Sequence, residues 1–458
     1  MNRLHLGTLA ATLAIAGCSL IPTYERPAAP VAATFPTDSA GAGAPQGAAD
    51  MEWQTFFPDA RLKRLVEIAL QNNRDLRMAV LAVEQTRAQL QLRRADELPS
   101  LNAGLNLTRG PNTSGAIAST YTAGLSITAY ELDIFGRVRA LSQSAQAQLL
   151  ASDEARKTVQ ISLFASVANT YLNLLADGEL LRVTRDTLAT RRDSLKLTQL
   201  KFDNEAASKL DLSQAQSLFE GARIALAQVT RQRAQDENAL VLLLGQPLPS
   251  DLPSGLGLQE QNLLPSLPAG VPSDLLMRRP DVRQAEQVLL ANNANIGAAR
   301  AAFFPRITLT GSAGVVSSDL ENLFSNGTSA WTFVPQLLQP IFDGGRNQAN
   351  LDSAKVSRDI AVAQYEKAIQ NGFKEVADAL AGYATLAEQL RAQTAQLDAE
   401  KTRMQLVQLR FEHGAASTLD LLDAQRSLFA VQLAQVQTQT LSHQNLVTLY
   451  KALGGGWK

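Results

Sequence analysis

The chain is poor in aromatic residues, in histidine and in cysteine, and it carries no excess of charge. Its 458 residues include one Cys and three His, only 5% are aromatic, and the formal net charge is −1. A single Cys cannot form an internal disulfide or a thiolate cluster, and so few His leave little room for a zinc or iron site. The balanced charge gives no basic footprint for nucleic acid.

The sequence also lacks the residue groupings that enzymes use. His5 lies in the N-terminal leader, and His413 and His443 have no metal ligand or nucleophile motif near them in the sequence. The glycines at 454–456 follow no predicted strand and begin no helix, so they are not a phosphate-binding loop. We therefore expect no enzyme activity, no metal, no cofactor apart from attached lipid, and no nucleic-acid partner.

Apolar runs long enough to cross a bilayer as a helix are absent. The run Leu6–Ala16 is shorter than the roughly 20 residues that a membrane helix needs. A basic residue before it and small residues after it indicate a signal peptide over residues 1–17. This excludes a helical inner-membrane transporter, and a chain of this kind that crosses a membrane must do so as a β-barrel.

The only cysteine lies at the end of this leader. Ile15-Ala16-Gly17-Cys18 resembles the lipobox of bacterial lipoproteins, which implies that Cys18 is the first mature residue and carries diacylglycerol and a fatty acyl group. A signal-peptidase site with an incidental Cys is the alternative. Residue 19 is Ser rather than Asp, which in such lipoproteins implies sorting to the outer membrane. Residues 18–61 are rich in Pro, Ala and Gly and predict an extended, lipidated tether.

An internal duplication organises the rest of the chain. Residues 200–216 (LKFDNEAASKLDLSQAQ) and 409–425 (LRFEHGAASTLDLLDAQ) are identical at 10 of 17 positions, at an offset of 209. Pro99 pairs with Pro305 at an offset of 206, and Ile134-Phe135 with Ile341-Phe342 at 207. We therefore divide the chain into repeat 1 (62–247), a Pro- and Leu-rich linker (248–271) and repeat 2 (272–458).

Each repeat has the same predicted order: a helix (61–97 and 273–302), two strands, and a long helical hairpin. Period-two alternation predicts strands at about 100–109 and 120–130, and at about 306–316 and 330–340, with Thr, Ser and Asn along one face. Pro335 suggests a bulge or bend in the fourth strand. The hairpins are predicted over 137–245 and 345–454, with turns at 204–208 and 413–417 and a weak point at Asp177-Gly178.

The number of strands predicts an assembly. Four strands cannot close a membrane barrel, and lipid does not tolerate open sheet edges. Two copies would give about 8 strands, whose interior side chains fill, whereas three would give about 12 and leave room for water behind the polar face. A trimer or larger assembly follows, with the hairpins continuing the barrel as a tube. A soluble strand pair resting on helices is the alternative.

Several segments together resemble one known family. They are YELDIFGRVRA (130–140), RRPDVRQAE (278–286), QPIFDGGR (339–346) and FEHGAASTLDLLDAQRSLF (411–429). With the lipobox and the repeated unit, they are similar to the outer-membrane efflux channel family, the TolC-like outer membrane factors in their NodT-type lipoprotein branch. The resemblance covers nearly all of the mature chain.

The resemblance implies a fold that is mostly α with a membrane β-barrel portion. It implies a homotrimeric, 12-stranded barrel, four strands per chain, continued by a long periplasmic α-helical barrel of coiled-coil hairpins. The implied function is the exit channel of a tripartite efflux system, with a periplasmic adaptor protein and an inner-membrane transporter, of RND type or of another type. The implied location is the outer membrane of a Gram-negative bacterium, in contact with its lipid, with a large periplasmic extension.

Another class of protein is the alternative to a channel. A periplasmic adaptor or a structural coiled-coil lipoprotein would also contain long hairpins. An adaptor, however, normally has one hairpin and a soluble β-domain, whereas this sequence predicts two hairpins that each follow a strand pair. The cargo is not identified, because specificity in such pumps lies mainly with the inner-membrane transporter.

The resemblance places a gate at the periplasmic ends of the hairpins. Asp420 and Asp423 lie at i and i+3, hence on one helix face, and in a trimer they would form carboxylate rings that favour cations. Interaction with the helix N-terminus is the alternative. In repeat 1, Asp211 takes the place of Asp420, and Gln214 replaces the second acid.

The lock that holds this gate differs from the family pattern. The family's Tyr and Arg positions correspond to Phe411 and Ala416, which lack the hydroxyl and the guanidinium. We expect packing through Phe202 and Phe411, or Asp211 with a donor such as Lys209, to substitute. Small residues at the two turns would let an adaptor hairpin approach, with simple loop sterics as the alternative. These residues are Ala206, Ala207, Ser208, Gly414, Ala415, Ala416 and Ser417.

Overall fold

A computed structural model describes residues 19–32, 35, 52–261, 263, 278–325 and 328–457. The predicted signal peptide, the lipidation residue Cys18 and much of the linker lie outside the described residues. The chain divides into two compact units, which are taken separately below. Unit 1 comprises residues 1–29, 81–154 and 283–368, and unit 2 comprises residues 30–80, 155–282 and 369–458.

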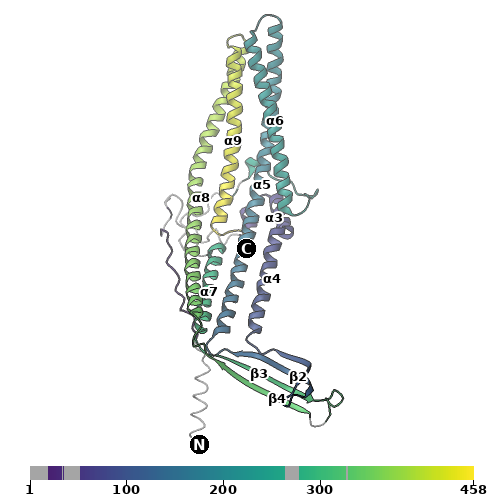
Figure 1. Ribbon diagram of the computed structural model, residues 1–458. Helices are drawn as coiled ribbons and strands as arrows, with labels where there is room; N and C mark the ends of the chain where they lie inside the picture. The colour runs from purple at the N-terminus through teal and green to yellow at the C-terminus, as the bar shows by residue number, and fades with distance from the viewer. Residues whose placement is uncertain are drawn as a thin grey trace. The chain divides into compact units, whose positions relative to one another are not determined.

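Unit 1 contains one antiparallel sheet of four strands in the order β1-β2-β3-β4. They are β1 (Leu101–Pro111), β2 (Ile117–Leu132), β3 (Arg306–Ser317) and β4 (Ser329–Leu338) (Figure 1). All four overlap the segments in which alternation predicts strands. Strands β2 and β3 join the two repeats, and Gly124 lies opposite Gly314 between them. A Cβ on Gly314 would lie 2.1 Å from the Ala123 carbonyl oxygen, so this pairing has no room for a side chain.

The predicted irregularity at Pro335 is wrong. Pro335 lies opposite Leu309 in an unbroken β3–β4 register. In the described sheet β4 pairs with β3 only, and proline fits such a strand where its nitrogen faces away from the paired neighbour. The register shifts instead in β2, between Ile127 and Tyr130, where Ala129 has a φ of 51°.

Four long helices form the two hairpins. They are α5 (Arg137–Asp203) with α6 (Lys209–Leu244), and α8 (Arg346–Glu412) with α9 (Thr418–Ala452) (Figure 1). Helix α5 passes Asp177-Gly178 without interruption, so the predicted weak point does not break it. One 18-residue window of α5 is apolar enough to cross a membrane by length and composition, and half of it is buried inside the fold.

The helices that begin each repeat are α3 (Ala60–Asn72), α4 (Arg74–Ala95) and α7 (Pro280–Ala301). The prediction of one helix over 61–97 is wrong, because the backbone at Asn73 is extended, with φ −61° and ψ 133°. The Asn73 side chain accepts a bond from the Leu76 N–H at 2.9 Å and thereby starts α4. Helix α7 has Pro at its first position, where the missing N–H costs nothing.

The duplication recurs in the bonds that close each repeat, both in unit 2. The Asn73 amide donates to the Leu243 carbonyl at 2.9 Å, and Arg279 donates to the Ala452 carbonyl at 2.8 Å. The donors are 206 residues apart and the acceptors 209, which are the offsets seen in the sequence. Equivalent side-chain bonds, from an amide in one repeat and a guanidinium in the other, therefore tie the start of each repeat to the end of its last helix.

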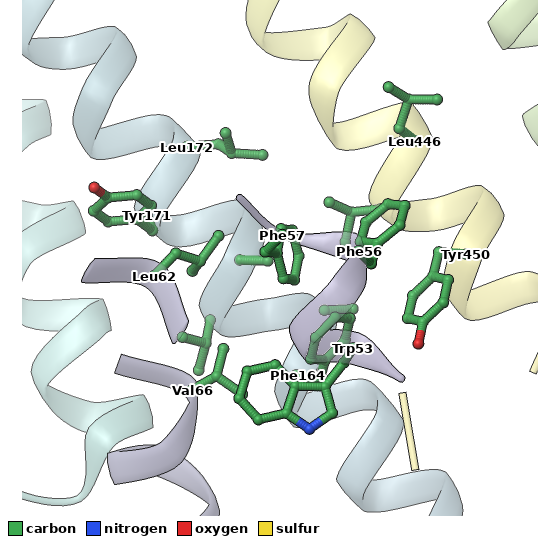
Figure 2. Packing of buried hydrophobic residues seen from close by; sticks show 14 of the residues in the cluster. Trp53, Phe56, Phe57, Leu62, Val66, Phe164, Tyr171, Leu172, Leu446 and Tyr450 are labelled. Carbon is green, nitrogen blue, oxygen red and sulfur yellow. The ribbon is translucent and has the colours of Figure 1, made fainter. Parts of the chain in front are cut away.

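The core of unit 2 is aromatic, and it includes residues that the sequence assigned to the tether. Helix α2 (Trp53–Phe56) places Trp53, Phe56 and Phe57 against Phe164 and Tyr450 (Figure 2). The Phe56 and Tyr450 rings stack at 4.4 Å between centroids. A tether that extends to residue 61 is therefore wrong over 52–61, because burial of these large rings outweighs the Pro, Ala and Gly composition before them.

Residues 19–26 of unit 1, the N-terminal strap, are extended along α7. Arg26 binds the Glu286 carboxylate through Nε at 2.7 Å and Nη2 at 3.0 Å, and the Tyr24 hydroxyl donates to it at 3.0 Å. Asn293 donates to the Pro22 carbonyl at 2.8 Å. Gly297 gives the strap room to pack against α7, because a Cβ at this position would lie 2.4 Å from the Ile21 side chain. This part of the predicted tether is a docked segment.

Candidate functional site

The ends of the two hairpins in unit 2 have the same backbone geometry. The Ala206 N–H donates to the Lys201 carbonyl at 2.7 Å, and the Ala415 N–H donates to the Arg410 carbonyl at 2.7 Å. The residue before each alanine has a positive φ, 57° at Glu205 and 73° at Gly414. Both hairpins therefore turn by one motif, which we call the repeat-1 tip (204–208) and the repeat-2 tip (413–417). Of the predicted adaptor-facing residues there, Ala207 and Ala416 are half-buried and the others are exposed.

Asp211 and Asp420 cap the helices that leave these tips. Asp211 accepts bonds from the Ser208 hydroxyl at 2.6 Å and its N–H at 3.0 Å, and Asp420 accepts the same bonds from Ser417 at 2.8 and 2.9 Å. Each serine hydroxyl in turn accepts from the aspartate N–H, which completes a capping box. The interaction of these aspartates with a helix N-terminus, which we gave as the alternative to a gate, is thus present.

The same bonds keep both carboxylates charged. The Ser208 hydroxyl, followed by the Ser208 N–H, lowers the pKa of Asp211 below its ordinary value. The Ser417 N–H, followed by the hydroxyl, lowers the pKa of Asp420. Asp420 is exposed and Asp211 is half-buried, and with their lowered pKa values both carry a negative charge at neutral pH.

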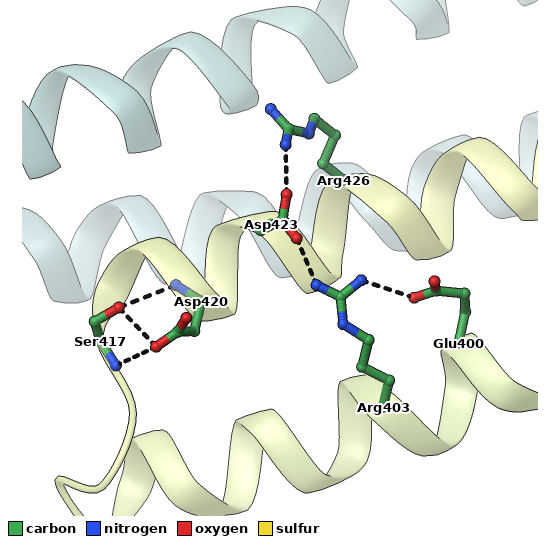
Figure 3. Close-up of polar contacts among 6 residues, drawn as sticks. All are labelled: Glu400, Arg403, Ser417, Asp420, Asp423 and Arg426. Carbon is green, nitrogen blue, oxygen red and sulfur yellow. Dashed lines mark hydrogen bonds and ion pairs between the residues drawn. The ribbon is translucent and has the colours of Figure 1, made fainter.

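Both oxygens of the Asp423 carboxylate are paired with arginines. One oxygen binds Arg403 of α8 at 2.5 Å and the other binds Arg426 on its own helix (Figure 3). Arg403 also pairs with Glu400 at 3.2 Å. The Arg403 bond is the largest influence that lowers the pKa of Asp423. We call this group the repeat-2 tie, because it joins the two helices of the second hairpin.

Repeat 1 has no counterpart of this tie. At an offset of 209, Ser194, Gln214 and Ser217 take the places of Arg403, Asp423 and Arg426. The donor to Asp211 in the structure is Ser208, rather than the Lys209 that we named as an example. The Lys209 ammonium lies instead over the Phe202 ring, 5.4 Å from its centroid.

The two phenylalanines that we expected to pack the gate are half-buried, and each carries a cation on its face. Lys201 of α5 lies 4.2 Å from the Phe411 centroid, so this contact joins the two hairpins. Phe202 is covered from within its own hairpin by Lys209. Cation–π contacts at such partly exposed sites contribute roughly 0.5–1 kcal/mol each.

Sequence reasoning missed the arginines that hold the hairpins. Besides Arg403, Arg191 is buried on α5, donates to the Leu218 carbonyl at 2.9 Å and lies 5.0 Å from the Phe429 centroid. Burial lowers the pKa of Arg191. The available signal was the pair of acid–Arg i,i+3 spacings, Glu400–Arg403 and Asp423–Arg426, on facing helices.

Comparison with known proteins shows the family. The chain matches the outer membrane efflux protein family over residues 65–246 and 271–455. It is 44% identical over 467 residues to the probable efflux pump outer membrane protein TtgC of Pseudomonas putida, covering 100% of this chain and 96% of that protein. It is 47% identical over 458 residues to the solvent efflux pump outer membrane protein SrpC of Pseudomonas putida, covering 98% and 97%.

The structure is similar to solved channels. Against the open state of the MtrE outer membrane channel of Neisseria gonorrhoeae, the TM-score is 0.89 at 41% identity, over 96% of this chain and 99% of that one. The predicted fold class is confirmed: a mostly α chain whose four strands belong to a trimeric β-barrel, continued by a helical tube. The relatives are transport proteins.

The same comparisons decide between the alternatives for function. They confirm an outer-membrane channel of a tripartite efflux system with a periplasmic extension, rather than an adaptor or a structural lipoprotein. The chain belongs to the outer membrane efflux protein family.

Proposed function

We propose that the chain forms a homotrimeric exit duct, without catalytic activity, that is gated at the hairpin tips by the repeat-2 tie. The observation that carries this is the ion pair from Arg403 on α8 to Asp423 on α9, close to the tip of one hairpin only. Release of that pair would let α9 move against α8, whereas the repeat-1 hairpin has no such bond to release. Each copy then contributes one hairpin that this ion pair can lock and release, and one hairpin without it.

The charges at the repeat-2 tip give the closed gate its ion preference. Asp420 keeps a full negative charge, and Asp423 shares its charge with two arginines. Three copies would place rings of these carboxylates around the axis, and such rings attract cations and repel anions. Both the tie and the rings are weakened by salt, because Asp420 is exposed and Arg403 and Asp423 are partly exposed to solvent.

Single-channel recording in planar bilayers tests the gate. Asp420→Ala with Asp423→Ala is expected to raise conductance or to reduce block by cations, since it removes the carboxylates and releases Arg403. Asp211→Ala with Gln214→Ala is the matched control, because it removes the equivalent cap, worth about 1 kcal/mol, without touching an ion pair. Unchanged conductance in the first variant, or an equal rise in both, contradicts the proposed gate.

We propose that the tips meet a periplasmic adaptor, which connects the duct to an inner-membrane transporter of RND type. The exposed small residues at both tips support this, as do the names of TtgC and SrpC, which assign them to efflux pumps. Ala206→Cys and Ala415→Cys should cross-link in cells to a periplasmic adaptor protein. Gln235→Cys, exposed on α6 away from the tip, is the control that should not.

We also propose that Cys18 carries lipid and anchors the chain to the outer membrane. The support is the lipobox and the position of the only cysteine. Labelled palmitate should be incorporated into the wild-type protein and not into Cys18→Ser. An unlabelled wild-type protein contradicts the anchor and favours an ordinary signal-peptidase site.

A further inference from the structure

Within one chain, a groove of about 680 Å³ separates the two hairpins near their tips. One wall is formed by Thr190, Asp193, Ser194, Leu197 and Lys201 of α5. The other wall belongs to α8 and α9. Two contacts cross the groove: the Lys201 ammonium on the Phe411 ring at 4.2 Å, and a bond from the Gln425 amide to the Ser194 hydroxyl at 2.8 Å.

The α5 wall has a duplicate on α8. At the offset of 209, its five residues correspond to Ala399, Thr402, Arg403, Leu406 and Arg410. All five line a second, more open groove of about 710 Å³. No described residue from another element lines this second groove, and Leu406 is 58% exposed. The duplication has therefore produced two equivalent walls. Residues of the same chain cover the α5 wall, and the α8 wall is open.

The surface that would fit the second wall also exists. The residues opposite the α5 wall include Phe411, Glu412 and Gln425, and the offset of 209 carries them to Phe202, Asp203 and Gln216 of repeat 1. Asp203 and Gln216 are exposed and Phe202 is half-buried. Repeat 1 thus carries the complement of the open α8 wall, but in its own chain that complement does not face the wall.

We propose that repeat 1 of a second copy of this chain occupies the α8 groove, with Arg410 lying over Phe202 of the next copy. This proposal rests on the trimeric channel proposed above and adds the residues that join its copies at the tips. Around a trimer, Lys201–Phe411 contacts within chains would alternate with Arg410–Phe202 contacts between chains.

The charges fit this arrangement. Within the chain, the cation Lys201 and the anion Glu412 line opposite walls of the groove. Between copies, the offset places the cation Arg410 opposite the anion Asp203, so the signs are retained. A guanidinium stacks on an aromatic face and keeps further donors free. Arg410 can therefore hold its own tip, where it donates to the Ala415 carbonyl at 3.0 Å, and still cover a ring of the next copy.

Photo-cross-linking of the full-length protein in detergent-extracted membranes tests the contact. Benzoylphenylalanine in place of Phe202 should give a covalent dimer on denaturing gels, and mass spectrometry should join residue 202 to the peptide that contains Arg410. The same photoreactive residue in place of Phe411 is the matched control. It should react within one chain, with the peptide that contains Lys201, and give no dimer.

The outcomes separate this proposal from the trimeric channel. If native mass spectrometry shows trimers and residue 202 reacts only with its own chain, for example near Lys209, the Arg410–Phe202 contact is wrong while the channel stands. If the protein is not a trimer, the channel proposal itself fails. Arg410→Lys should keep the dimer product, because the in-chain contact already uses Lys, and Arg410→Glu should reduce it several-fold.

Discussion

At the scale of single residues, buried carboxylates differ in how they are partnered. Asp59 is fully buried and accepts bonds from the Tyr171 hydroxyl at 2.9 Å and the Gln261 amide at 2.6 Å. Glu286 is 7% exposed and is held by Arg26 and Tyr24 of the N-terminal strap. The strap supplies the partners of this carboxylate, so it belongs to the folded unit.

Glu286→Ala should release the strap. Loss of a partly exposed ion pair with a buried partner is expected to cost about 1–3 kcal/mol, less than for a fully buried pair. Chymotrypsin should then cut after Tyr24 faster than in the wild-type protein. Glu321→Ala, in the exposed loop after β3, is the control. Equal cleavage rates for Glu286→Ala and the wild type would show that the ion pair does not hold the strap.

Asp177 is buried beside other acids. Burial, followed by the neighbouring Asp236 carboxylate, raises the pKa of Asp177 from 3.8 to about 7, and one of its oxygens has no hydrogen-bond partner. Glu237 acts in the same direction and Arg233 opposes it. A carboxyl group whose pKa is raised on folding favours the folded state when it is protonated. That contribution is complete below the ordinary pKa and is lost as the pH rises through 7.

Asp177→Asn should therefore stabilise unit 2 at high pH only. The expected gain in unfolding free energy at pH 8 is about 1–3 kcal/mol, and it should fall towards zero near pH 4. Thermal unfolding followed by circular dichroism across this range measures it. Asp186→Asn, at an exposed position on the same helix, should show no such trend. A gain that is independent of pH would mean that Asp177 is not protonated in the folded state.

At the scale of elements, two glycines in or beside the hairpin helices make opposite predictions. Gly178 is inside α5, and a Cβ there would meet nothing within 4 Å. Gly245 follows α6 with a φ of 68°, and a Cβ there would lie 2.3 Å from the Asn72 carbonyl oxygen. The first glycine only costs helix stability, whereas the second makes the close approach that ends repeat 1.

Gly178→Ala should raise the unfolding free energy by about 0.5–1 kcal/mol, because alanine loses less conformational freedom in a helix. Gly245→Ala should lower it by roughly 1–3 kcal/mol, through the positive φ and the clash. Parallel denaturant titrations of the two variants measure both. If Gly178→Ala were the more damaging variant, α5 would need flexibility at this point.

Secondary structure was predictable where the residues fit a single pattern of hydrophobic spacing or repetition. Alternation located the four strands, and the duplication located both tips. The break at Asn73 could not be read from the sequence, because apolar residues continue at helical spacing on both sides of it. Helix α2 was missed because its aromatic residues follow a Pro- and Ala-rich segment, and only the folded core shows where they pack.

The candidate site was predictable in position but not in chemistry. Asp420 lies where the sequence placed it, at the tip, yet its bonds are those of a capping box. Of the two partners of Asp423, Arg426 lies at i+3 and could be predicted from spacing, whereas Arg403 could not, because it is 20 residues away on the facing helix. Nothing in the sequence states which face of α8 meets α9 at that point.

At the scale of the whole molecule, unit 1 shows the same relation as the tips: a contact within the chain has duplicated counterparts that are exposed. Phe135 stacks on Phe304 at 4.8 Å, which joins repeat 1 to repeat 2 within the chain. Their counterparts at offsets of 207 and 206 are Phe342 and Leu98, which are 92% and 70% exposed. Since Phe342 belongs to repeat 2 and Leu98 to repeat 1, we expect them to meet between copies.

Phe342→Ala should lower the temperature at which the trimer dissociates on semi-native gels. Leu98→Ala should do the same, and the double variant should fall less than the sum, because both changes remove one contact. The in-chain pair Phe135→Ala and Phe304→Ala should act on folding of the monomer. Strictly additive effects of Phe342→Ala and Leu98→Ala would mean that the two side chains do not touch.

Helices α5 and α8 each have 67 residues. This equality limits how the gene can change in length. Removal of seven residues from α5 alone would shorten that helix by about 10 Å relative to α8. In a trimer, three of the six hairpin tips would then end short of the other three. Insertions and deletions should therefore survive only in matched pairs, one in each repeat. The length of the duct would then change only when both repeats gain or lose the same number of residues.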